Sequence, residues 1–223
     1  MDFRHEWKHA ITRSDLPALR SRLGAVMQRD AYAVNGRYTI RSLYFDNLTD
    51  KALREKTDGV DRREKFRLRC YNGDHSLILL EKKSKVHNLC SKAQTALSLQ
   101  EVQALLRGNF AGAAERDDPL LQELRYKMCT QGLRPKTIVD YTREPFVFAP
   151  GHVRVTLDYD IRTGLNGTDF FNPGCITVPA GCAPVILEVK WDAFLPSVIR
   201  DIVQTPGTHT GSFSKYAACR LYG

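Results

Sequence analysis

Apolar and charged residues alternate along several short segments of the chain, and this alternation predicts strands. In residues 65–71, three apolar side chains alternate with Lys65, Arg67 and Arg69. Successive side chains of a strand point to opposite faces, so one face of this strand is apolar and the other carries a row of cations. The same reasoning predicts further strands over residues 2–12, 37–45, 76–85, 136–143, 146–148, 153–160 and 185–191.

Leucines at helical spacing predict helices between these strands. Ser14 or Asp15 is a suitable N-cap for a helix that continues to about residue 27. Ser98 and Glu101 have the form of a capping box and open a helix that continues to about residue 107. Further helices are predicted over residues 48–56, 118–132, 196–203 and 213–219, and a loop over 163–183.

About eight strands joined by turn-compatible connections predict an α+β fold with an antiparallel sheet. Two arrangements satisfy the pattern, an open sheet whose charged face meets solvent and a closed barrel whose charged face lines a tunnel. Stacked cations such as Arg67 and Arg69 repel each other unless an anion lies between them, which favours the tunnel. Because the chain has no linker, repeat or low-complexity tract, we expect one domain over residues 1–223.

Composition narrows the class of protein. The formal net charge of +8 and a pI near 9.2 favour a polyanionic partner such as nucleic acid, a phosphate chain or an anionic membrane. The six cysteines are scattered without a CxxC pair, so we expect reduced thiols in a cytoplasmic protein, with no disulfide framework or zinc site. No apolar run is long enough to cross a bilayer, and we expect no membrane insertion.

Eight short motifs occur in order along the chain. They are Arg4-x-Glu6-x-Lys8, Ser42-Leu43-Tyr44-Phe45-Asp46, Lys65-Phe66-Arg67-Leu68-Arg69-x-Tyr71, Leu80-Glu81-x-Lys83, Tyr141-x-Arg143, Arg154-x-Thr156-x-Asp158, Leu187-Glu188-x-Lys190 and Ser214-Lys215. Together they resemble the vacuolar transporter chaperone (VTC) domain, the polyphosphate polymerase branch of the CYTH-like triphosphate tunnel metalloenzymes. The resemblance implies an antiparallel β-barrel that forms a charged tunnel, with helices packed outside and a triphosphate or polyphosphate bound inside.

The resemblance also implies roles for individual side chains. Arginines would hold phosphate oxygens through paired N–H donors, and lysines would supply compact positive charge. The implied catalytic residues are Lys8, Arg67, Arg69, Lys83, Tyr141, Arg143, Arg154, Lys190, Ser214 and Lys215. Those implied to bind the nucleotide are Arg67, Arg69, Arg143 and Lys215. The alternative interpretation is an ordinary surface cation for the arginines and lysines, and a packed side chain for Tyr141.

A carboxylate among so many cations is expected where a hard metal ion bridges protein and phosphate. Glu188 is the first candidate to bind Mn²⁺ or Mg²⁺, and Glu6 and Glu81 are weaker candidates. The alternative for each is an ion pair with a neighbouring lysine or arginine. The six histidines show no spacing typical of metal ligands.

The implied function is metal-dependent phosphoryl transfer from ATP or another nucleoside triphosphate, with polyphosphate synthesis and ADP release. Two alternatives use the same site: a triphosphatase, in which water is the acceptor, and a non-catalytic polyphosphate or nucleotide receptor. Residues 86–92 lack the dense basic cluster expected in the family, which counts against a polymerase. Nucleic-acid binding requires stacking aromatics beside Arg67 and Arg69, but Phe66 points to the other face, so we expect no nucleic-acid partner.

Overall fold

A computed structural model describes residues 4–87, 89–109, 116–182, 184–205 and 209–221. The strands form one antiparallel sheet in the order β11-β1-β10-β8-β7-β3-β4-β5-β6. The long strands are β1 (His5–Ile11), β3 (Tyr38–Asp46), β4 (Arg63–Tyr71), β5 (Asp74–Val86), β6 (Leu89–Leu97), β7 (Arg134–Phe148), β8 (Val153–Thr163) and β10 (Val185–Trp191). Three short strands are added at the margins: β2 (Gln28–Arg29), β9 (Val178–Pro179) and β11 (His209–Thr210).

Six α-helices and one 3₁₀ turn accompany the sheet. They are α1 (Asp15–Val26), α2 (Lys51–Thr57), α3 (Leu99–Leu106), α4 (Pro119–Thr130), η1 (Pro150–His152), α5 (Ser197–Ile202) and α6 (Lys215–Leu221). None of the helices that the structure describes is long and apolar enough to cross a membrane.

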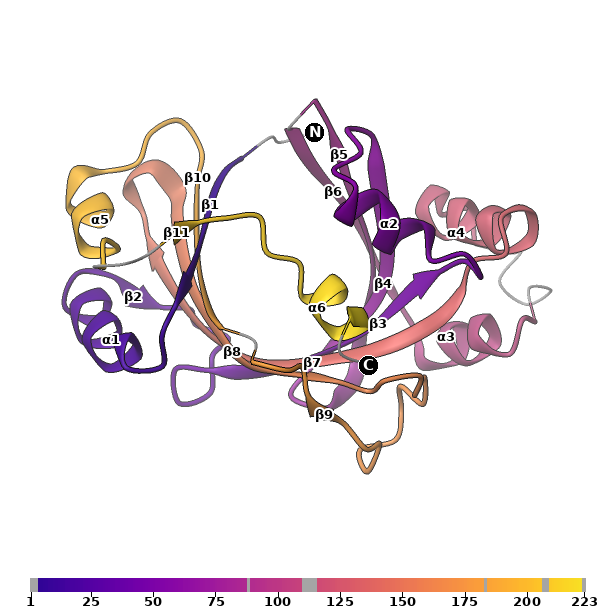
Figure 1. Ribbon diagram of the computed structural model, residues 1–223. Helices are drawn as coiled ribbons and strands as arrows, with labels where there is room; N and C mark the ends of the chain where they lie inside the picture. The colour runs from indigo at the N-terminus through magenta and orange to yellow at the C-terminus, as the bar shows by residue number, and fades with distance from the viewer. Residues whose placement is uncertain (1–3, 88, 110–115, 183, 206–208, 222–223) are drawn as a thin grey trace.

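The sheet curls into a half-barrel, with β1, β10 and β8 in one wall, β7 and β3 in the floor, and β4, β5 and β6 in the other wall (Figure 1). The antiparallel α+β fold predicted from the sequence is therefore confirmed, and its barrel is an open one. Between the described parts of β1 and β6 no strand pairing closes the barrel. A side-chain contact spans the two walls instead, because Lys83 Nζ lies 3.5 Å from Glu6 Oε2.

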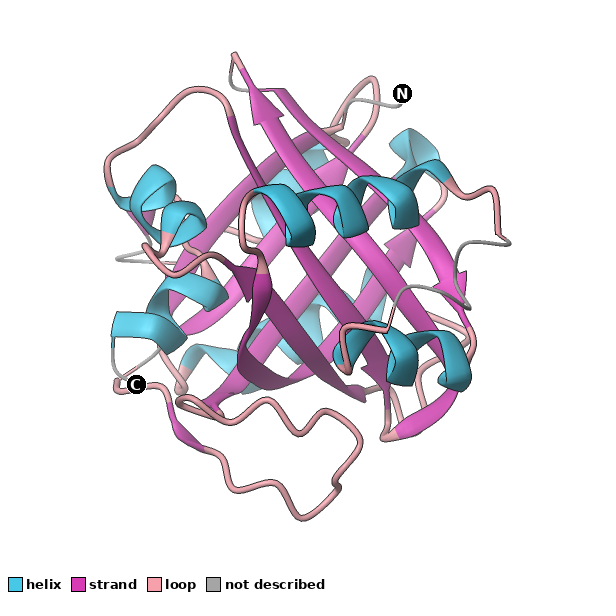
Figure 2. Ribbon diagram, turned by 90° about the vertical axis from the view of Figure 1, so that its right-hand side faces the viewer, coloured by secondary structure: helices cyan, strands magenta, loops and turns pink. Residues whose placement is uncertain are grey.

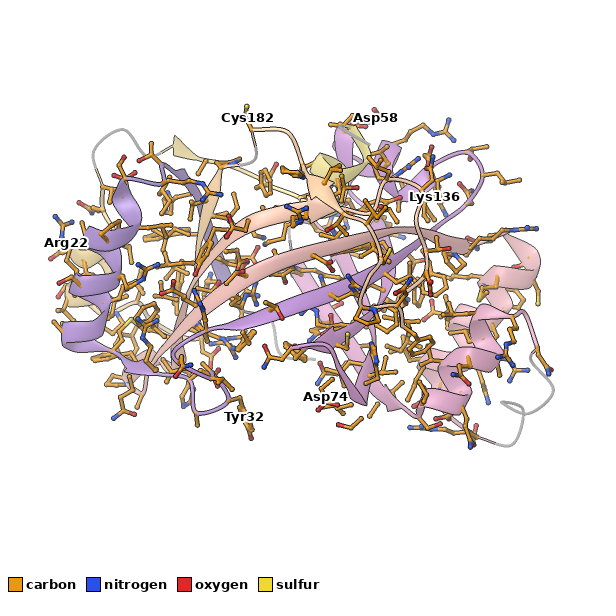
Figure 3. The ribbon with its side chains drawn as sticks, turned by 90° about the horizontal axis from the view of Figure 1, so that it is seen from below. Arg22, Tyr32, Asp58, Asp74, Lys136 and Cys182 are labelled. Atoms are coloured by element: carbon orange, nitrogen blue, oxygen red, sulfur yellow. The ribbon has the colours of Figure 1, made fainter. Side chains whose placement is uncertain are left out.

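Helices cover the convex face, as the outward apolar side chains of the strands require. Helix α1 and helix α5 cover one wall, and α3 and α4 cover the other (Figures 1 and 2). The first core includes Leu19, Leu23, Val155, Leu157 and Leu187, and the second includes Phe66, Leu68, Leu80, Val102 and Leu124. Seen from below, the floor strands run between the helices of the two walls, with Arg22 at the outer margin (Figure 3).

Local sequence signals explain where the covering helices begin. The capping box predicted for α3 is present, since Ser98 and Glu101 each bond the other's backbone N–H. Asp118 accepts two backbone N–H groups at the start of α4. For α1 the expectation for Ser14 is wrong, because its side chain makes no capping bond. Asp15 does not cap the helix either, because the backbone N–H that it accepts, at 2.8 Å, belongs to Thr12, which precedes the helix.

Helix α6 lies on the concave side of the sheet (Figure 1). Tyr216 and Cys219 pack there against apolar side chains of the floor, including Ile40 and Val139. The Tyr216 hydroxyl donates to Asp46 at 2.6 Å, which fixes the helix to the end of β3. The concave face is thus part apolar, under α6, and part charged.

Candidate functional site

The charged part of the concave face forms a cavity of about 340 Å³. Eleven lysine and arginine side chains line it, against three carboxylates. The cations are Arg4, Lys8, Lys65, Arg67, Arg69, Lys83, Lys92, Arg143, Arg154, Lys190 and Lys215, and the carboxylates are Glu6, Glu81 and Glu188. This surplus of eight positive charges equals the formal net charge of the whole chain. Basic and acidic residues are therefore equal in number outside the cavity. The basic pI reflects the cavity rather than the outer surface.

Every residue that the sequence analysis singled out as catalytic, nucleotide-binding or metal-binding lines this cavity. Alternation along the strands brings them together, because residues two apart on a strand share a face and a curled sheet turns that face inward. Arg67, Lys83 and Lys215, for which the alternative was an ordinary surface cation, therefore lie together in one cavity. Their proposed roles in binding and catalysis are argued below.

Glu81 is a buried carboxylate that holds two arginines in place. It lies opposite Arg67 in the β4–β5 ladder and accepts from its Nε at 2.6 Å. Arg69 Nη1 lies 3.6 Å from the same oxygen, and Lys92 Nζ lies 2.5 Å from the other. Burial by itself raises the pKa of this carboxyl, but Arg67 and Arg69 outweigh it and hold the pKa well below its usual range. With both oxygens facing cations, Glu81 is better placed to position arginines than to bind a metal.

A second buried carboxylate, Asp158, organises the floor of the cavity. Arg143 donates to its two oxygens at 2.6 and 2.7 Å, and Lys215 Nζ lies 2.6 Å from one of them. Lys215 is the first residue of α6, and its amine lies 4.6 Å from the ring centroid of Tyr141. Helix α6 therefore places the Lys215 amine in the same cavity as the cations of the strands.

Glu188 and Glu6 form the wall of the cavity opposite Glu81. In the β1–β10 ladder Lys8 lies opposite Glu188, and Glu6 lies opposite Lys190. The Lys190 amine lies 2.6 Å from Glu188 Oε1 and 3.5 Å from Glu6 Oε2, so both carboxylates can reach one cation. Burial raises the pKa of Glu188, but the effect of Lys190 and Lys8 is larger and holds it well below its usual range. Glu188 is thus ionised and able to bind a cation.

Several cavity residues were not among the predicted site residues. Lys65 is in phase with Arg67 and Arg69 on β4, so the alternation that identified those arginines also identifies it. Tyr44 accepts a hydrogen bond from Arg67 at 2.7 Å. Burial raises the pKa of Tyr44, but nearby Arg67 and Lys65 lower it to about 8 overall. Tyr44 belongs to one of the eight motifs, but an aromatic residue in a largely apolar strand indicates core packing, so no role in the cavity was predicted for it.

Two lysines of the cavity are predicted to take up protons when a polyanion binds. Burial, together with Lys83 and Lys190, lowers the pKa of Lys8 to about 7, and burial lowers that of Lys65 to about 8. A bound phosphate chain favours the charged amines and raises both pKa values. The contribution of these two amines to tripolyphosphate affinity should therefore decline as the pH rises through 7 and 8.

Titration calorimetry in buffers of different ionisation enthalpy measures this proton uptake. The control is Lys8→Arg, which keeps a charge at every pH and should bind tripolyphosphate with less proton uptake than the unmodified chain. Equal uptake by the two proteins at pH 8 would exclude Lys8 as a source of the pH dependence.

The fold resembles those of solved structures with little sequence identity. A candidate adenylate cyclase from Bacillus halodurans matches with a TM-score of 0.52 and 14% identity, over 85% of this chain and 80% of that chain. The PH1819 and PH1012 proteins from Pyrococcus horikoshii give TM-scores of 0.44 and 0.45 at 14% and 13% identity. Each alignment covers 89% of this chain, and the two alignments cover 84% of the PH1819 chain and 85% of the PH1012 chain. No curated protein matches the chain.

A family model accounts for nearly the whole chain. The VTC domain matches residues 3–222, which include all eight motifs and every strand of the half-barrel. The fold is accordingly of the triphosphate-tunnel type, with the charged faces of its strands turned inward. The chain belongs to the VTC domain family.

Proposed function

We propose that this protein is a metal-dependent phosphotransferase that makes polyphosphate from ATP and releases ADP. The observation that carries the proposal is the cavity on the concave face of the half-barrel, with eleven cations and three carboxylates. Such an excess repels itself unless a polyanion lies inside it, and a phosphate chain is narrow enough to do so. These cations line the inside of the half-barrel and do not form an outer basic surface, so they are poorly placed to contact the phosphates of a nucleic-acid duplex.

Phosphoryl transfer depends on positioning and on neutralising charge, and needs no covalent nucleophile from the protein. In the proposed reaction, an oxygen of the terminal phosphate of a polyphosphate chain attacks the γ-phosphorus of ATP. The bond from that phosphorus to the β,γ-bridging oxygen breaks, and ADP leaves with this oxygen. Arg67 and Arg69, held by Glu81, would neutralise the transferred group, and Lys215 would do so from α6.

The donor set of the cavity fits a divalent metal. Glu188 and Glu6 would hold Mg²⁺ or Mn²⁺, since the Lys190 ammonium already occupies a point within reach of both carboxylates. Among the residues that the structure describes, no cluster of three or more histidine, cysteine or acidic side chains could hold a metal unaided. Magnesium is commonly held by one or two carboxylates together with substrate phosphates, which suits this pair. When bound, the ion would neutralise charge on the phosphate oxygens.

A basic opening beside the cavity supports a long phosphate chain as the product. This opening has a volume of about 590 Å³ and shares Lys65 and Lys83 with the cavity. It adds Lys56, Arg63 and Lys85, none of which forms an ion pair with a carboxylate in the described part of the chain. A triphosphatase has no need of cations beyond the triphosphate site, whereas a growing chain must pass over them. This observation favours the polymerase over the triphosphatase.

The decisive assay is incubation with ATP and Mn²⁺, followed by ³¹P NMR and gel analysis of the products. We expect ADP and polyphosphate of increasing length. Orthophosphate in place of polyphosphate would identify a triphosphatase, and tight ATP binding without turnover would identify a receptor. Absence of binding by both ATP and tripolyphosphate would refute the phosphate site itself.

Neutralising the basic opening should weaken the binding of long chains selectively. The double variant Lys56→Gln, Lys85→Gln removes two cations outside the triphosphate cavity. We expect affinity for long-chain polyphosphate to fall about tenfold, with tripolyphosphate binding unchanged within about twofold. Calorimetry with the two ligands measures the difference, and Lys51→Gln on the exposed side of α2 is the matched control. Equal losses of affinity for both ligands would show that the growing phosphate chain does not pass through this opening.

A further inference from the structure

The buried tyrosines in the described part of the chain use their hydroxyl groups in two different ways. Tyr159 donates to Glu144 at 2.7 Å, and Tyr216 donates to Asp46 at 2.6 Å. A carboxylate only accepts, so both of these hydroxyl protons are already bonded within the protein. Neither tyrosine is among the residues that line the cavity.

The other three buried tyrosines line the cavity, where each hydroxyl oxygen accepts a hydrogen bond from an arginine. The pairs are Arg67 with Tyr44 at 2.7 Å, Arg69 with Tyr141 at 3.1 Å, and Arg154 with Tyr38 at 2.9 Å. A guanidinium group only donates, so these bonds do not use the hydroxyl protons. Among the residues that the structure describes, none accepts a hydrogen bond from these three hydroxyls.

Tyr141 was already a predicted site residue, whereas Tyr38 and Tyr44 on β3 were not. Tyr44 lies opposite Arg67 in the β3–β4 ladder, and Tyr38 lies opposite Arg143 in the β3–β7 ladder. Opposed residues of antiparallel strands share a face, so a phosphate that contacts these arginines lies beside the two hydroxyls. Tyr38 and Tyr44 are only 7% and 2% exposed, and a buried donor without an acceptor costs free energy.

We infer that the hydroxyl groups of Tyr38 and Tyr44 donate hydrogen bonds to oxygens of the bound phosphate chain. The inference rests on the proposed function and adds two neutral donors to its cationic site. The cavity carboxylates already contact lysines and arginines, so the phosphate oxygens are the acceptors that the hydroxyls lack.

A neutral donor has an advantage in this cavity. Its eleven cations repel each other, and a further charge would add to that repulsion. A phenol hydroxyl contributes a hydrogen bond to the ligand without adding charge. Each tyrosine would thus contact the phosphate chain with its proton while its oxygen positions an arginine.

The test is to replace each of the two tyrosines by phenylalanine, which keeps the ring and removes the hydroxyl. Calorimetry measures tripolyphosphate binding below the pKa of about 8 that Tyr44 has in the cavity, where its hydroxyl keeps the proton. We expect Tyr38→Phe and Tyr44→Phe each to weaken binding about tenfold. The melting temperature should change little, because the arginines that contact these hydroxyls keep their carboxylate partners.

Tyr159→Phe is the matched control, because it also removes the hydroxyl of a buried tyrosine in the sheet. The proton of that hydroxyl is donated to Glu144, away from the cavity. We expect the opposite pattern for this variant, a lower melting temperature with tripolyphosphate binding within about twofold of the unmodified protein.

A double-mutant cycle separates donation to the ligand from positioning of the arginine. If Tyr44 acts only by holding Arg67, then Tyr44→Phe has no effect once Arg67 is replaced by methionine. Because we infer direct donation, we expect Tyr44→Phe to weaken tripolyphosphate binding about five- to tenfold in the Arg67→Met protein as well. No further loss in that protein would overturn the inference and leave Tyr44 as a positioning residue.

Failure of the proposed function and failure of the inference give different results. If the unmodified protein does not bind tripolyphosphate, the proposed function fails, and the tyrosine donors fail with it. If it binds, and both Tyr38→Phe and Tyr44→Phe bind within about twofold of it, the phosphate site stands and only the tyrosine donors are refuted.

Discussion

Replacing Glu188 by glutamine is expected to reduce ATP turnover about a hundredfold or more while the protein still binds tripolyphosphate. The amide keeps the size of the side chain but loses the charge that would hold the metal. It also makes a cavity with an excess of cations more positive, which favours a polyanion. Turnover and binding should therefore change in opposite directions, a pattern that simple unfolding does not produce.

The measurement is ADP release with Mn²⁺, paired with calorimetry of tripolyphosphate binding. Glu123→Gln is the matched control, because Glu123 also contacts lysines but lies outside the cavity. Unchanged turnover in Glu188→Gln, or turnover that needs no metal in the unmodified protein, would remove Glu188 from its proposed role.

Replacing Arg67 by methionine is expected to weaken tripolyphosphate binding by about ten- to a hundredfold, because hydrogen bonds to a charged group contribute about 1.5–3 kcal/mol. The fold should survive. Glu81 keeps Arg69 and Lys92 as partners, so its buried charge is still compensated. Methionine also fills much of the space that the arginine stem occupied.

Arg143→Met is the informative comparison for Arg67→Met. Asp158 is fully buried and would lose both hydrogen bonds from Arg143, leaving Lys215 as its remaining cation. Breaking a buried pair in this way typically costs about 3–5 kcal/mol of stability. Thermal unfolding should therefore separate the two variants, with Arg143→Met unfolding at a lower temperature. Similar melting temperatures for both would show that Asp158 does not depend on Arg143.

The resemblance to the VTC domain supplied the predicted site residues, and alternation along single strands supported part of that set. Arg67 and Arg69 are supported in this way, because each sits two residues from another cation on a strand whose opposite face is apolar. What alternation could not decide is whether the charged faces meet, since that depends on how the sheet curls. Tertiary contacts decide it, including the packing of α6 on the concave side through Tyr216.

Strand β6 was not predicted, and its residues explain why. Between Leu89 and Leu97 the strand is mostly small or polar, with exposed positions on both faces. As a strand at one end of the sheet order, it is fixed by its ladder with β5 rather than by an apolar face. Lys92 was not among the predicted site residues, although it lines the cavity and contacts Glu81.

The most direct test is a crystal structure with a non-hydrolysable ATP analogue and Mn²⁺. We predict that the three phosphates lie on the concave face within hydrogen-bonding distance of Arg67, Arg69 and Lys215, with anomalous scattering from manganese beside Glu188. A nucleotide bound on the outer helices, or a concave cavity without ligand at a saturating concentration, would contradict the view that the inward charges form a phosphate site.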